Sequence, residues 1–150
     1  MTTTTLAAVK LALEGTIRAL DPGGTAMGQG KYRVASAAFD WDKRAASDCD
    51  RTFSIQDFTR TEPMFFGSTS ETDYRVKFTI IVGHVMSPNN RFACETRRDT
   101  DLFQIAAALE SFANFPTGVS IVRLANMSVS DKADRWISTL TMDAQMGYAI

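Results

Sequence analysis

The strongest constraint on the fold is the run DYRVKFTIIVGHV at residues 73–85, in which apolar and polar residues alternate. Successive side chains of a β-strand point to opposite faces of the sheet, so this alternation predicts a strand with one buried face and one wet face. The apolar side consists of Tyr74, Val76, Phe78, Ile80 and Val82, and the polar side of Arg75, Lys77 and Thr79. Such a strand is typical of an antiparallel sheet that is covered on one face only.

Two segments have the period of an amphipathic helix. In residues 6–20 the apolar face is formed by Leu6, Val9, Leu13, Ile17 and Leu20, and in residues 100–115 by Leu102, Ile105, Leu109 and Phe112. The threonines before Leu6 can cap the first helix, and Asp99 or Thr100 can cap the second. Residues 86–99 contain Ser87-Pro88-Asn89-Asn90 and are therefore interpreted as a turn-rich loop.

Further strands are expected at residues 32–34, 51–58 and 119–129, and in the closing run 134–150. In that run Trp136, Leu140, Met142, Met146 and Tyr148 share one side, which predicts packing against the helices. Tyr148 and its neighbours are expected to extend toward an adjacent subunit.

Clustered strands with few helical crossovers favour an α+β fold over a doubly wound α/β sheet. We expect one domain over residues 1–150, with a mainly antiparallel sheet and the two amphipathic helices packed on one face. Residues 59–73 contain proline, glycine and many Ser and Thr residues, which predicts an extended loop or hairpin arm.

Composition excludes several classes of protein. The chain is 45% hydrophobic and 22% charged, its net charge is −1, and its pI is about 5.8. It therefore lacks the excess of basic residues with which a whole domain binds nucleic acid. The two cysteines, Cys49 and Cys94, lack the spacing of a zinc or redox motif and are expected to be free thiols. No run of apolar residues is long enough to span a membrane, so a cytoplasmic, non-membrane protein is expected.

The sequence offers few candidates for chemistry, and we predict no catalytic, cofactor-binding or metal-binding residues. His84 is interpreted as a strand-end residue, because no nucleophile or orienting group can be assigned to it. Asp40, Asp42, Asp48 and Asp50 lack the spacing of a calcium loop, and a solvated loop with internal ion pairs is the better interpretation. The glycines of residues 23–30 match neither the dinucleotide fingerprint nor the P-loop.

Two groups are candidates for contacts between subunits. Met64, Phe65 and Phe66 stand in a polar stretch, and either enter the core of the domain or contact another chain. Arg97 and Arg98 form the densest basic group, partly neutralised by Asp99 and Asp101, and are expected at the surface or at a subunit contact.

The order of these segments resembles that of the tail terminator, or tail completion, proteins of long-tailed bacteriophages. The pieces that carry the resemblance are LAAVKLALEGTIRAL, DRTFSIQDF, YRVKFTIIVGH, DLFQIAAALESF, and the pair GVSIVRLANMSV and DRWISTLTMDAQMGY. The resemblance covers about residues 5–148 and implies a structural virion protein without cofactors. It implies a ring, expected to be a hexamer, that stops polymerisation of the tail tube protein and joins the tail to a head connector or stopper protein.

The same resemblance places the protein in the neck of the virion, after assembly in the host cytoplasm, with DNA passing through the ring without being read in sequence. Two alternatives remain open at this point. The first is another connector component, such as a stopper or a tube-like protein. The second is a small α+β enzyme or ligand-binding domain with His84 or the aspartate loop as its site.

Overall fold

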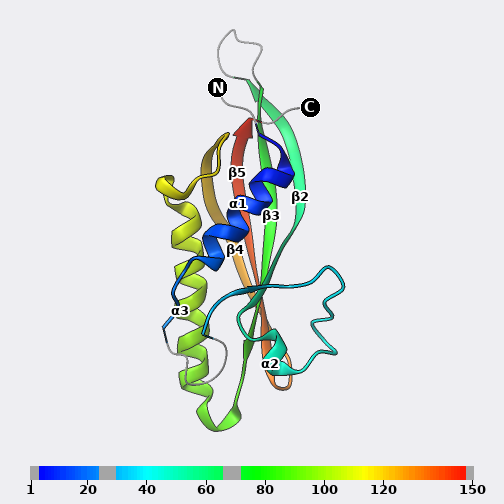
Figure 1. The fold of residues 1–150 in the computed structure, drawn as a ribbon, viewed down its shortest axis with the longest axis vertical. Coiled ribbons are helices and arrows are strands. Elements are labelled where there is room, and N and C mark those ends of the chain that lie inside the picture. Colours follow the sequence, from blue (N-terminus) through cyan, green and yellow to red (C-terminus); the bar gives the residue numbers. More distant parts are fainter. Residues whose placement is uncertain (1–3, 24–29, 66–71, 148–150) are drawn as a thin grey trace.

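The computed structural model describes residues 4–23, 30–65 and 72–147; of residues 61–65 and 72–73 it gives the backbone alone. Along the chain lie α1 (Leu6–Arg18), β1 (Arg33–Val34), α2 (Ala46–Cys49), β2 (Thr52–Phe65), β3 (Thr72–Val85), η2 (Pro88–Asn90), α3 (Arg91–Glu110), η3 (Phe112–Asn114), β4 (Val119–Asp131) and β5 (Arg135–Gly147). Helices α1 and α3 lie on the same side of the sheet, with α3 running alongside β4 and α1 crossing the central strands (Figure 1). The predicted α+β fold is confirmed.

Within the described residues the strands form one five-stranded sheet in the order β1-β2-β3-β5-β4. The two-residue strand β1 pairs in parallel with Thr52 and Phe53, and every other pairing is antiparallel. The chain leaves β3, returns through α3, forms β4 at the edge of the sheet, and then places β5 between β3 and β4. Strands β2, β3, β5 and β4 therefore alternate in direction across the sheet.

Helix α1 begins and packs as its sequence predicts. The Thr5 hydroxyl accepts a hydrogen bond from the backbone N–H of Ala8 at 3.1 Å, which satisfies one of the unpaired donors at the helix start. On the buried face, Val9, Leu13 and Ile17 belong to the main core. From α3, that core receives Leu102, Ile105 and Leu109, and the apolar face of β3 is buried against both helices, as predicted.

The predicted boundaries of the second helix are wrong. Helix α3 begins at Arg91 rather than near Thr100 and ends at Glu110 rather than Phe115. Residues 91–99, interpreted as a loop, form its first half, and the buried positions of this half include Cys94 and Arg97. The periodicity of apolar residues could not reveal this half of the helix, because its buried face is partly charged.

The predicted arm is a β-hairpin as far as the structure describes it. Strands β2 and β3 remain paired out to Phe65 and Thr72, with register shifts between Gln56 and Thr59 and between Arg60 and Pro63. Asp57, within the first shift, has a positive φ of 60°, which is consistent with a bulge in the strand.

Within the closing run, strand β5 confirms the predicted alternation for Arg135–Gly147. Its buried side includes Trp136, Leu140, Met142 and Met146, and Tyr148 lies outside the described residues. None of the helices in the described part of the chain has the length and apolar character that crossing a membrane requires.

Candidate interaction surface

One face of the sheet, called the uncovered face below, is covered by neither α1 nor α3 (Figure 1). Because successive side chains of a strand point to opposite faces, the residues that alternate with the buried ones point to this uncovered face. It carries Arg75, Lys77 and Thr79 on β3, Thr139, Thr141, Asp143 and Gln145 on β5, and Arg123, Asn126 and Ser128 on β4. The uncovered face is thus mainly uncharged and polar, with a few charged side chains.

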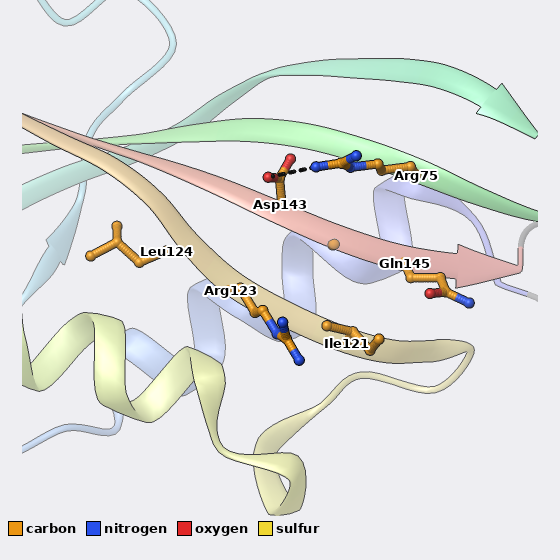
Figure 2. Close-up of a pocket in the computed structure, with 7 residues that line it drawn as sticks. Arg75, Ile121, Arg123, Leu124, Asp143 and Gln145 are labelled. Atoms are coloured by element: carbon orange, nitrogen blue, oxygen red, sulfur yellow. Dashed lines mark hydrogen bonds and ion pairs between the residues drawn. The ribbon is translucent and has the colours of Figure 1, made fainter. Parts of the chain in front are cut away.

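A shallow groove of about 420 Å³ lies on this face toward the β4 edge (Figure 2). It is lined by Arg75, Ile121, Arg123, Leu124, Asp143, Ala144 and Gln145. Arg75 donates from Nη2 to Oδ2 of Asp143 at 3.2 Å, and Arg123 lies opposite Asp143 in the ladder. Since the Arg75 side chain is 56% exposed, this ion pair stabilises the fold by at most about 1 kcal/mol.

The two edges of the sheet are open to different degrees. Among the described residues, no strand pairs with the outer edge of β4, which is 13 residues long. Ile121, Met127 and Val129 on this strand are 38–40% exposed. On the other edge, β1 covers only the beginning of β2, at Thr52 and Phe53. Long edge strands with exposed apolar residues readily accept another strand, and monomeric proteins usually protect them.

A cleft of about 350 Å³ opens beside β2 where its pairing with β1 ends. It is lined by Lys10 and Glu14 of α1, by Val34, Ala35, Ser36, Ala37, Phe39 and Trp41, and by Ser54, Ile55 and Gln56 of β2. Phe39 and Trp41 pack edge to face with their ring centroids 4.7 Å apart. The segment between β1 and α2 that carries these rings extends outward on the β2 side, away from α3 (Figure 1).

A network of charged side chains lies inside the molecule, between α3 and the sheet. Asp101 accepts from Nε and Nη2 of Arg51 at 2.7 and 3.0 Å, and its Oδ2 lies 2.8 Å from Nε2 of His84. All three side chains are at most 2% exposed. Burial would raise the pKa of Asp101, but the hydrogen bonds from His84 and Arg51 outweigh burial and hold this pKa below its usual value.

His84 is therefore a buried residue rather than the simple strand-end residue that its sequence suggests. Its contact with Asp101 requires the proton on Nε2, since the carboxylate can only accept. Within the described residues, Nδ1 of His84 and the hydroxyl of Ser138 have no hydrogen-bond partner. At 1% exposure, the ring is closed off from solvent. The geometry is that of an internal ion-pair network.

A second buried pair corrects two predictions. Arg97 donates from Nη1 and Nη2 to the two carboxylate oxygens of Asp50 at 2.7 and 2.8 Å. Arg97 is 7% exposed and Asp50 is fully buried, so Arg97 is not a surface residue and Asp50 does not belong to a solvated loop. The other three aspartates of that loop, Asp40, Asp42 and Asp48, are exposed as expected.

The remaining contact candidates are placed only in part. The Arg98 guanidinium lies 4.5 Å from the ring centroid of Trp136, and its side chain is 14% exposed, so it mainly packs within the subunit. The backbones of Met64 and Phe65 lie in β2, opposite Asp73 and Thr72. Phe66 and Tyr148 lie outside the described residues.

Arg51 and Asp101 are interior charges that the sequence pattern did not predict. One signal was present: Cys94, Arg97, Asp101 and Ile105 recur at helical spacing and share the buried face of α3. Among the described residues, no group of three or more His, Cys, Asp and Glu side chains is arranged to hold a metal ion.

Comparison with protein-family models gives no match to this chain, and comparison with the curated proteins gives none. The fold and the surfaces of the molecule are therefore the basis for assigning a function.

Proposed function

We propose that this chain is a structural protein of a phage neck, a tail terminator that assembles into a ring, which we expect to be a hexamer. The observation that carries the proposal is the sheet that stays open at both edges, at β4 and along β2 beyond Phe53, within the described residues. Two unlike edges on one subunit allow a head-to-tail contact, and such contacts generate closed rings when the rotation between subunits closes.

The order of elements supports the family resemblance of the sequence. An N-terminal helix precedes a β2–β3 hairpin, a helix follows the central strand, and a hairpin of β4 and β5 completes the sheet. The partners of the proposed ring are the tail tube protein on one side and a head connector or stopper protein on the other. DNA passes through the ring without sequence recognition, a role that needs no base-specific side chains.

The interior charges support a structural role over an enzymatic one. Both oxygens of Asp101 accept hydrogen bonds from Arg51, and both oxygens of Asp50 accept from Arg97. A general base needs access to the proton that it removes, and these carboxylates are already occupied and buried. We therefore assign no catalytic residue, cofactor or metal.

The test begins with the size and shape of the purified protein. Light scattering is expected to give about six subunits, and negative-stain images are expected to show rings. Added to polymerising tail tube protein, the rings should bind one end of each tube and stop its growth. A monomer at every attainable concentration contradicts the proposal, and open-ended polymers of this chain alone favour a tube-like protein instead.

A further inference from the structure

We infer that the ring is joined by strand addition: the β4 edge of one copy pairs with the β2 edge of the next, and Met127 and Val129 enter the cleft beside β2. The partner of both edges is a second copy of this chain. It rests on the proposed function for the assembly of a ring, but the contact itself is argued from strand direction, side-chain facing and shape.

Strand direction is compatible with this contact. Because β2, β3, β5 and β4 alternate in direction, the edge strands β2 and β4 run opposite to each other. When neighbouring copies are placed side by side with the same orientation, β4 of one copy is therefore antiparallel to β2 of the next. The antiparallel pattern of the sheet then continues across the contact without inverting a subunit.

The side of the sheet to which the side chains of β4 point is also compatible with this contact. Met127 and Val129 lie opposite Leu140 and Ser138 of β5, both of which are buried on the side of the sheet that carries the helices. Directly paired residues of antiparallel strands point to the same side, so Met127 and Val129 face the helical side at the very edge of the sheet. There they remain 39% and 40% exposed.

The cleft beside β2 lies where these two side chains would arrive. It borders β2 at Ile55, whose side chain belongs to the buried core, and it is bounded on the helical side by α1. Val34, which is 39% exposed, and the paired rings of Phe39 and Trp41 provide its apolar surface. Burial of exposed apolar side chains against this surface would add to the hydrogen bonds of strand addition.

The contact is heterologous, since the surface on β4 differs from the surface beside β2, and this property allows a test by complementation. One variant, Met127→Lys with Val129→Lys, disables only the β4 surface. A second variant, Val34→Lys with Phe39→Lys, disables only the cleft. Lysine is used in both so that the altered surfaces repel each other and cannot form a new ion pair.

Each variant alone should shift from the size of the wild-type assembly to a monomer of 16.5 kDa. A 1:1 mixture should form a dimer of twice that mass and nothing larger, because each pair retains one intact contact. Matched controls place lysines close by on side chains that do not enter the cleft: Ser128→Lys with Ser130→Lys, which lie on β4 but point to the uncovered face, and Ala38→Lys with Ala45→Lys, which are exposed in the loop. Both controls should keep the wild-type size.

Three outcomes overturn the inference: a wild-type size for either variant, a mixture that stays monomeric while circular dichroism shows folded protein, and assembly that appears only when tail tube protein is added. A failure of the proposed function is a separate result. If the mixture dimerises but wild-type rings do not stop tube growth, the strand contact holds and the terminator role fails.

Discussion

Arg97 of α3 and Asp50, at the end of α2, form a fully interior ion pair in which two N–H groups meet two carboxylate oxygens at 2.7 and 2.8 Å. Asp50 also accepts from the backbone N–H of Val85 at 3.0 Å. One carboxylate thus joins the first half of α3 to the end of β3. The pair explains why a helix with a partly charged buried face stays docked on the sheet.

Removal of the Arg97 guanidinium should destabilise the protein strongly. Arg97→Ala leaves the Asp50 carboxylate buried without its cationic partner, which costs about 3–5 kcal/mol of unfolding free energy. Urea unfolding measures this loss, and Arg123→Ala on the uncovered face is the exposed control, expected to change stability by less than about 0.5 kcal/mol. If both variants unfold at the same urea concentration, the pair does not dock α3.

Acid should weaken the fold through Asp101. Its folded pKa lies below the usual 3.8, so its contribution to stability is present above pH 3.8 and is lost as the pH falls through the folded pKa. The unfolding free energy of the wild type should therefore decrease as the pH is lowered through this range. Asp101→Asn should be less stable at pH 7 and should lose less stability with acid; an unchanged acid slope would contradict the role of Asp101.

Gly83 should tolerate no side chain. A Cβ at this position would lie 2.3 Å from the backbone oxygen of Cys49, and the backbone there is fixed because Arg51 donates its N–H to the Gly83 oxygen at 2.7 Å. Gly83→Ala should destabilise the protein by about 1–3 kcal/mol, as overpacking does.

Gly15 provides the matched control for this substitution. It lies within α1, and no atom outside its own helix would come within 4 Å of an added Cβ. Gly15→Ala should stabilise the protein by roughly 0.5–1 kcal/mol, because alanine favours the helix more than glycine does. Thermal unfolding of the two variants should thus shift in opposite directions, and equal shifts would show that the close approach at Gly83 is relaxed without cost.

The elements that the sequence predicts well are those whose burial is apolar and periodic. Val76, Phe78 and Ile80 alternate with polar residues, and Val9, Leu13 and Ile17 recur at helical spacing, so β3 and α1 are predicted nearly to the residue. The first half of α3 was missed because Arg97 occupies a position where the pattern requires an apolar residue, and Asp101 continues this charged face into the second half. Their partners, Asp50 and Arg51, lie about 50 residues away, and only the fold brings them together.

The surfaces were harder to predict than the core. In the sequence, Met127 and Val129 have the pattern of ordinary strand residues. They are exposed because β5 is inserted between β3 and β4, which leaves β4 at the edge of the sheet. Strand order of this kind depends on contacts across the whole chain, which local periodicity does not encode.

Phe65 and Phe66 should contribute to assembly rather than to folding. Phe65→Ser with Phe66→Ser should reduce the size of the assembly, because large apolar residues in a polar stretch of sequence are suited to contact another chain. Phe92→Ser with Phe112→Ser is the matched control: these side chains are 82% and 81% exposed and lie outside the proposed strand contact, so the assembly should keep its size. Light scattering measures the size, and circular dichroism reports on the fold. Loss of the folded signal in the first variant, with or without a change in size, would assign Phe65 and Phe66 to the core and contradict their role at a subunit contact.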